Sequence, residues 1–235
     1  MKNRPGDEFL EELERIRSDF LQGRPFRDRG AARSREEIAE ARRKRQRGGD
    51  NNHRFEGERY LNCPVKSVRR MQLRKLIDEG GQTTVGGKMA SHVELARWES
   101  YEFGLKSEEV AQLEKEDPLP QKLIVDGWWT NLMRTSHWAV AIGSSLVGEG
   151  EKRIPGIRQR LLQEIETLRK EYAAMGIKNL DRALANRIEH AGIDVEHSEF
   201  GANVVRQHVN SPELQEDLRK AFILTIQGRG TSERF

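Results

Sequence analysis

The sequence contains one cysteine, few aromatic residues and no long apolar run. Cys63 has no partner for a disulfide within the chain, which favours a reducing, cytoplasmic compartment. The longest apolar stretch, residues 138–148, is too short to span a bilayer, and no N-terminal signal pattern is present. Because 41 basic and 38 acidic residues leave a net charge of only +3, the overall charge requires neither a nucleic acid nor a membrane partner.

Charged residues and helix formers are abundant instead, with 34% of the chain charged and 35% apolar. Apolar spacing near 3.6 residues and capping signals predict helices, whereas residues 50–64 are expected to form a loop. No strand-like alternation is present. We therefore predict an all-α single domain over residues 1–235, with seven or eight helices. Charged helices occupy residues 1–50 and the core spans residues 62–226. The expected helices cover residues 6–21, 65–79, 88–103, 124–149, 157–172 and 180–209, with further helices starting at Ser107 and Ser211.

A basic run, residues 42–47, precedes a pair of glycines. Such a run can bind nucleic acid or another anionic partner, or it can be the solvated face of a helix. Glu36, Glu37 and Glu40 lie at the spacing that balances basic side chains on a helix, which favours the second interpretation.

The most specific local motif is a pair of histidines with an aspartate between them. His190, Asp194 and His197 stand at i, i+4 and i+7 on a predicted helix, so all three project from one stripe. Two imidazoles and one carboxylate suit non-haem iron, and also Mn or Zn. An exposed, charged helix with ordinary histidine hydrogen bonds is the alternative interpretation.

Further ligands must come from other helices. Glu79 ends one predicted helix, His92 lies one turn into the next, and Glu149 ends the apolar central segment. With the histidine motif they make three carboxylates and three imidazoles, the set of a two-metal site. The paired ExxH motifs of ferritin-like proteins are absent.

Several short motifs along the chain are shared with one known family. They are Asn62-Cys63-Pro64, Val68-Arg69-Arg70, Asp78-Glu79-Gly80, Gly104-Leu105, a helix ending in Ser-Ser-Leu, a following Arg-Leu, and Asp-Val-Glu-His at residues 194–197. Through these motifs most of the chain, from about residue 62 to residue 226, resembles pyrroloquinoline quinone synthase, a cofactor-free oxidase of the haem-oxygenase-like fold.

Two departures from that synthase point to another branch of the fold. His190 replaces a glutamine and Glu79 replaces a catalytic histidine, which completes the pattern of the haem-oxygenase-like diiron oxidases. The synthase's catalytic tyrosine corresponds to Ala183, which disfavours the synthase's own chemistry. The resemblance implies the ligands Glu79, His92, Glu149, His190, Asp194 and His197. Asp78 or Glu94 is an alternative ligand within the pair formed by Glu79 and His92. Glu151 is the alternative to Glu149.

The resemblance implies an enzyme that binds two Fe(II) ions and uses O2 as co-substrate, with Mn or a single iron left open. The reactions it suggests are N-oxygenation, oxidative C–C cleavage and nitrile formation in specialised metabolism. We expect a small amino-acid-like substrate, in particular an aromatic one, because arginines and aromatic residues accompany the ligands. The expected substrate-binding residues are Arg153, Arg158, Arg187, Trp128, Trp129, Trp138 and Phe103.

Two alternative functions stay open. The first is a metal-free oxidase or binding protein of the same fold, similar to the quinone synthase or to thiaminase II. The second is a helical nucleic-acid-binding protein that uses the basic run. A homodimer and an external reductant are also left open.

Overall fold

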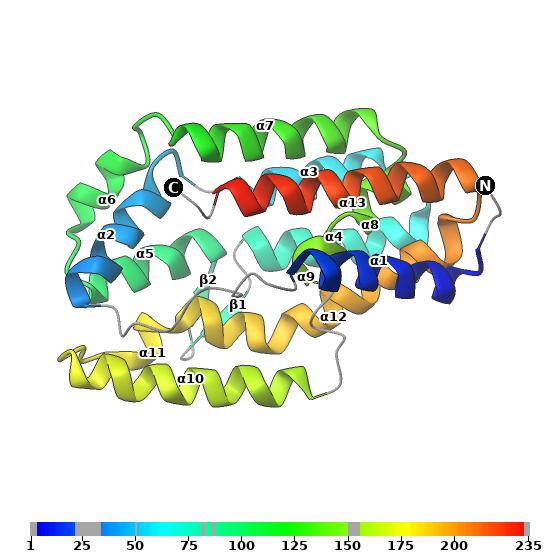
Figure 1. Ribbon diagram of the computed structural model, residues 1–235. Helices are drawn as coiled ribbons and strands as arrows, with labels where there is room; N and C mark the ends of the chain where they lie inside the picture. Colours follow the sequence, from blue (N-terminus) through cyan, green and yellow to red (C-terminus); the bar gives the residue numbers. More distant parts are fainter. Residues whose placement is uncertain are drawn as a thin grey trace.

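A computed structural model describes residues 4–21, 34–49, 51–80, 83–85, 88–149 and 156–232. Within these ranges the chain forms thirteen helices and one two-stranded antiparallel sheet, so the prediction of a predominantly helical protein is confirmed (Figure 1). The helices are α1 (Gly6–Leu21), α2 (Arg35–Gln46), α3 (Asn52–Asn62), α4 (Lys66–Gly80), α5 (His92–Glu102), α6 (Ser107–Leu113), α7 (Pro120–Thr135), α8 (Trp138–Gly143), α9 (Leu146–Glu149), α10 (Ile157–Ala174), α11 (Leu180–Ala183), α12 (Ala185–His208) and α13 (Pro212–Ser232). The strands are β1 (Thr83–Val85) and β2 (Lys88–Ala90).

The expected count of seven or eight helices is too low, partly because two predicted long helices are interrupted. Residues 124–149 belong to α7, α8 and α9. Ser136 leaves the helical conformation, and the imidazole of His137 accepts a hydrogen bond from the Ala139 N–H at 3.3 Å, which starts a new helix. Residues 180–209 are similarly divided into α11 and α12 at Leu184.

The predicted loop at residues 50–64 is also wrong, because α3 occupies most of it. The inward face of α3 carries Phe55 but also the charged residues Glu56 and Arg59, all at most 8% exposed. A search for apolar periodicity does not detect a helix whose buried face is charged.

The segment between α4 and α5 is a hairpin rather than the start of a helix. Thr83 pairs with Ala90 and Val85 with Lys88, so residues 88–90, which we expected to be helical, form β2. Helix α5 then begins with a capping box in which Ser91 accepts a hydrogen bond from the Glu94 N–H and the Glu94 carboxylate accepts one from the Ser91 N–H. The hairpin therefore separates the end of α4 from the start of α5.

Helix α12 lies between α10 on one side and α1 on the other, and it also contacts α5, α8 and α9 (Figure 1). The approach of α8 requires glycine, since a Cβ on Gly143 would lie 2.8 Å from Cγ2 of Val205. The largest group of buried apolar side chains lies where α1, α3, α7, α8, α12 and α13 meet. A second group lies among α2, α5, α6, α10 and α11. Helix α12 thus occupies the centre of the fold.

The basic run lies at the end of α2, facing α5 and α6. Arg42 and Arg45 both pair with Glu99, at 2.6 and 3.6 Å. Arg43 pairs with Glu109 at 2.7 Å, and Arg47 with Glu116 at 2.9 Å. The arginines of the run are therefore engaged in ion pairs within the chain, partly with acids other than those expected from the sequence.

None of the described helices combines the length and the apolar character that crossing a membrane requires.

Candidate metal centre

The end of α4 and the start of α5 bring Glu79 against His92. The carboxylate Oε2 of Glu79 lies 2.5 Å from Nδ1 of His92, although 13 residues separate the two in sequence. Both side chains are buried, with Glu79 8% and His92 3% exposed. The sequence predicted these two residues as partners, and the structure places them in contact.

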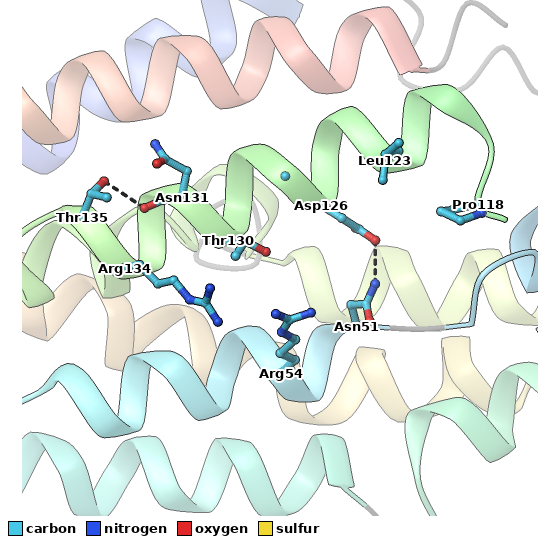
Figure 2. Close-up of a pocket in the computed structure, with 10 residues that line it drawn as sticks. Asn51, Arg54, Pro118, Leu123, Asp126, Thr130, Asn131, Arg134 and Thr135 are labelled. Carbon is cyan, nitrogen blue, oxygen red and sulfur yellow. Dashed lines mark hydrogen bonds between the residues drawn. The ribbon is translucent and has the colours of Figure 1, made fainter.

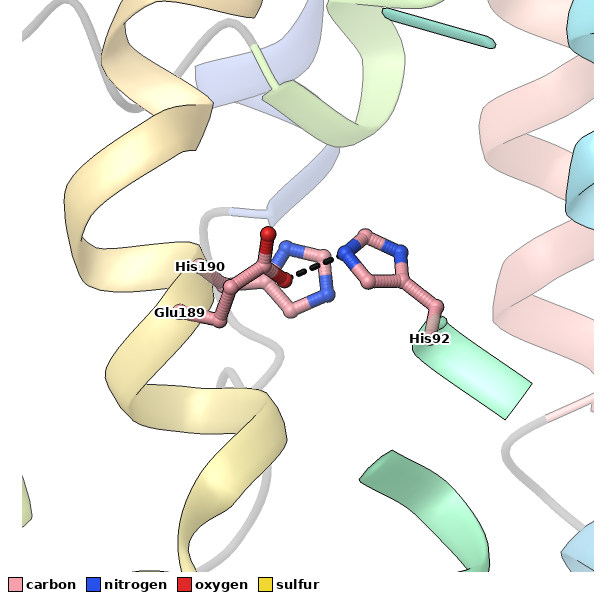
Figure 3. Close-up of side chains that lie close together, drawn as sticks. All are labelled: His92, Glu189 and His190. Carbon is pink, nitrogen blue, oxygen red and sulfur yellow. Dashed lines mark ion pairs between the residues drawn. The ribbon is translucent and has the colours of Figure 1, made fainter. Parts of the chain in front are cut away.

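Helix α12 completes the group with two consecutive residues, Glu189 and His190 (Figure 3). Glu189 forms an ion pair with Nε2 of His92, and the rings of His92 and His190 have their centroids 4.8 Å apart. One potential ligand atom from each of His92, Glu189 and His190 lies within 4.8 Å of the other two. We call Glu79, His92, Glu189 and His190 the His92 centre.

The charge of the His92 centre is dominated by its two carboxylates. Burial alone would lower the pKa of His92, but contacts with Glu189 and Glu79 outweigh it and raise the pKa to about 10. Without a bound cation, a protonated His92 therefore balances part of the negative charge. Because two carboxylates share one imidazolium, this buried group favours a further cation.

The donor atoms fit a transition metal. Nε2 of His92 is buried and makes no hydrogen bond of proper geometry with any described residue, although it faces Glu189. Two imidazoles and a carboxylate are the ligand set of many non-haem iron sites, and they also suit Mn or Zn. Glu79, on the opposite ring nitrogen, accepts the Nδ1–H bond that orients a metal-bound histidine.

His197 lies two turns further along α12 and contacts a different residue of α4. Its Nε2 is 3.3 Å from Oδ2 of Asp78, and the imidazole is 8% exposed. Asp78 and Glu79 are neighbours at the end of α4, so α4 supplies an acidic residue to His197 and another to His92. Asp78, which we considered as a substitute ligand, is thus part of a second pair beside the His92 centre.

A buried group around Glu56 lies next to this pair. Lys75 lies 3.4 Å from Glu56, Arg59 forms an ion pair with it, and Nε2 of Gln72 donates a hydrogen bond to it at 2.5 Å. Burial alone would raise the pKa of Glu56, but the charges of Arg59 and Lys75, the Gln72 hydrogen bond and the charge of His197 together lower it. We call Glu56, Arg59, Gln72 and Lys75 the Glu56 cluster.

Two other predicted ligands lie at the edge of what the structure describes. Glu149 is the last residue of α9 and Asp194 lies within α12, but their side chains are outside the described part of the chain. Glu151, the alternative to Glu149, is also outside it. Glu94, the alternative within the first pair, uses its carboxylate to cap α5.

The expected substrate-binding aromatic residues have packing partners of their own. Trp129 is 6% exposed and packs against Phe55, with the Arg59 guanidinium 5.4 Å from its ring centroid. Trp128 donates a hydrogen bond to Thr225. The remaining two, Trp138 and Phe103, pack edge-on against His208 and Tyr172 respectively.

The expected arginines are spread over the molecule. Arg187, on α12, pairs with Glu164 of α10 at 2.7 Å. Arg158 is exposed near the start of α10, and Arg153 lies outside the described residues. Their predicted role in binding a substrate stays a prediction.

Sequence reasoning missed Glu189 and Glu56. Glu189 is one residue away from the stripe shared by His190 and His197, and a helix rotates by about 100° per residue, so the stripe excluded it. Glu56 fell in the predicted loop. A search for acidic residues next to a histidine motif would have found Glu189.

A polar groove lies elsewhere, between α3 and α7 (Figure 2). Its volume is about 460 Å³, and its walls include Arg54 and Arg134. Arg134 pairs with Glu58, and Asn51 donates a hydrogen bond to Asp126 at the other end. The residues that line this groove do not include any member of the His92 centre.

A scan against models of known protein families and a search of curated proteins both find no match for this sequence.

Proposed function

We propose that this protein is a non-haem iron oxygenase that uses O2 to oxidise a small amino-acid-like substrate. The observation that carries the proposal is the convergence of His92, Glu189 and His190 in a buried position, with Glu79 behind His92. Iron held there would supply dioxygen activation through a change in its oxidation state.

The residues of the His92 centre have separate roles in this proposal. His92 and His190 donate neutral imidazole nitrogens, and Glu189 supplies negative charge. Glu79 accepts a hydrogen bond from Nδ1–H of His92, which leaves the Nε2 lone pair available to a metal ion. Because His92, Glu79 and Glu189 are all at most 8% exposed, little water reaches these donors.

In the diiron form of this proposal, Asp78 and His197 would hold the second iron. This pair supplies one carboxylate and one imidazole. Helices α4 and α12 each contribute to this pair and also to the His92 centre, where they provide Glu79 and Glu189. The diiron form is supported by the resemblance to haem-oxygenase-like diiron oxidases and by this proximity. A single iron at the His92 centre is the simpler form.

Iron binding can be tested by anaerobic titration with Fe(II), followed by elemental analysis and exposure to O2. We expect His92→Ala and His190→Ala to lose iron and the oxygen-dependent absorption together while keeping their helicity. His53→Ala is the matched control, because His53 is an exposed histidine on α3. Less than about one iron per wild-type chain, with no oxygen-dependent absorption, would favour a metal-free function and overturn the proposal.

His197→Ala distinguishes one iron from two. In a diiron protein this variant would lose about one of two irons and keep the other, because the His92 centre is unchanged. Wild-type iron content in His197→Ala would assign iron to the His92 centre alone.

The substrate class needs a separate assay. Arginine side chains recognise carboxylates, and Arg187 lies three residues before His190 on α12. We expect O2 consumption to be stimulated more by aromatic amino acids than by fatty acids. Faster conversion of long-chain fatty acids would contradict the expected substrate class without affecting the iron assignment.

A further inference from the structure

Glu99 is a buried acid on α5 that the proposed chemistry does not use. It is 1% exposed and lies seven residues after His92, about two helical turns along the same face. A carboxylate this deeply buried is costly unless its charge and its lone pairs are satisfied. Its two carboxylate oxygens contact two different helices, α12 and α2.

The first oxygen of Glu99 caps α12. Oε1 accepts a hydrogen bond from the backbone N–H of Asn186, at 3.3 Å. Helix α12 begins at Ala185 and has no side-chain cap from the residue before it, Leu184. The N–H groups in the first turn of a helix lack partners within that helix, so Glu99 supplies one from outside, with a negative charge at the positive end of the helix.

The second oxygen of Glu99 faces the basic run of α2. Oε2 lies 2.6 Å from Arg42 and 3.6 Å from Arg45. Gln46, in the same run, donates hydrogen bonds to the Ala96 carbonyl at 3.0 Å and to the Ser100 hydroxyl at 2.8 Å. The charge of Glu99 is thus balanced by α2, which is held along α5 next to it.

Glu99 and His92 contact α12 at residues that lie about one turn apart along α12, Asn186 and Glu189. Along α5, His92 precedes Glu99, whereas along α12 the partner of Glu99, Asn186, precedes Glu189. The two helices are therefore linked at two points in opposite order. A shift of the first turn of α12 would move Glu189 and His190 relative to His92.

We propose that Glu99 is a positioning residue for the His92 centre, and that the basic run of α2 holds Glu99 in place. By fixing the start of α12 against α5, Glu99 sets how Glu189 and His190 meet His92. The link to metal binding rests on the proposed function, whereas the link to the start of α12 does not.

The test uses the full-length chain, cobalt(II) as a spectroscopic probe and a competing chelator. We expect Glu99→Ala to weaken cobalt binding about 10-fold, the lower end of the loss caused by removing a direct partner of a metal ligand, because Glu99 acts on the ligands through α12; the visible absorption bands should also shift. Glu99→Gln should lose less affinity, because it keeps an oxygen that can accept from Asn186. The matched control is Glu109→Gln, which breaks a pair with the same basic run at Arg43 without reaching α12, and should bind cobalt as the wild type does.

Amide hydrogen exchange in the first turn of α12 supplies a second readout. Glu99→Ala should exchange faster there, with or without metal, whereas Glu109→Gln should not. If wild-type protein binds no cobalt, the proposed function fails while the exchange measurement still tests the role of Glu99. Wild-type cobalt affinity and spectrum in Glu99→Ala would overturn the positioning role, whatever the change in stability.

If Glu99→Ala does not fold, the cobalt-binding test uses Arg42→Met in its place. This variant keeps the acceptor for Asn186 and removes the closest cation, so we expect cobalt binding about tenfold weaker than in the wild type. Unchanged affinity in Arg42→Met would contradict the role assigned to the basic run.

Discussion

The His92 centre and the Glu56 cluster are both buried and both contain carboxylates, but they balance their charge differently. In the Glu56 cluster, Arg59 and Lys75 are cations of the chain itself, and Gln72 donates a hydrogen bond. In the His92 centre, both carboxylates contact the imidazole of His92. Permanent cations make the first group a complete structural unit, whereas the second gains from a cation that comes from solution.

The largest loss of unfolding free energy is expected from Lys75→Met, which removes a cation from the Glu56 cluster. Lys75 is 3% exposed, and its removal leaves the buried Glu56 with less positive charge around it. Breaking a buried ion pair by removing one partner costs about 3–5 kcal/mol of unfolding free energy. Urea unfolding measures this, with Lys66→Met as the control because Lys66 is exposed on the same helix. A loss below about 1 kcal/mol would show that the Glu56 cluster does not depend on its own cation.

A smaller effect over any single pH unit is expected from alkaline pH on the metal-free chain. The pKa of His92 is raised from 6.5 to about 10, so the stability that its protonated form provides is complete below pH 6.5 and is lost as the pH rises to about 10. The slope is at most about 1.4 kcal/mol per pH unit.

Unfolding by urea at several pH values, with a chelator present, checks this expectation. His92→Gln should have a flatter profile over the same range, because it has no group that titrates there. Equal slopes in the two proteins would assign the pH dependence to another group.

The smallest effect is expected at the surface, where Arg43→Met gives the baseline for both buried groups. Arg43 pairs with Glu109, but both side chains are about a third or more exposed. Contact with the Glu109 carboxylate raises the pKa of Arg43, yet solvent screens such a pair. Thermal unfolding should show a loss below about 1 kcal/mol. A loss as large as that in Lys75→Met would contradict the distinction between buried and exposed pairs.

Apolar periodicity predicts a helix such as α1 but not a helix such as α3. Helix α1 was predicted with its bounds because apolar residues such as Phe9, Leu10 and Leu13 follow the helical period, and all three are buried. Helix α3 was missed because Glu56 and Arg59 are part of its buried face. Apolar periodicity cannot reveal a side chain whose burial depends on a partner from another helix.

The same reason limits the prediction of the site. Glu79, His92 and His190 were selected by residue type, and the structure brings them together. His197 was expected on the same ion as His190, but its described contact is with Asp78 of α4. The geometry of α12 alone places both histidines on one stripe, and only the position of α4 determines which acid each one meets.

The β1–β2 hairpin has a consequence for the order of folding. It returns the chain so that Glu79 and His92 meet across only 13 residues, whereas Asn186 lies 87 residues from Glu99. Closing a short loop costs less entropy than closing a long one, so we expect α4, the hairpin and α5 to assemble first. Half of the candidate centre then forms from a local segment, and the docking of α12 both completes the fold and brings in the remaining donors.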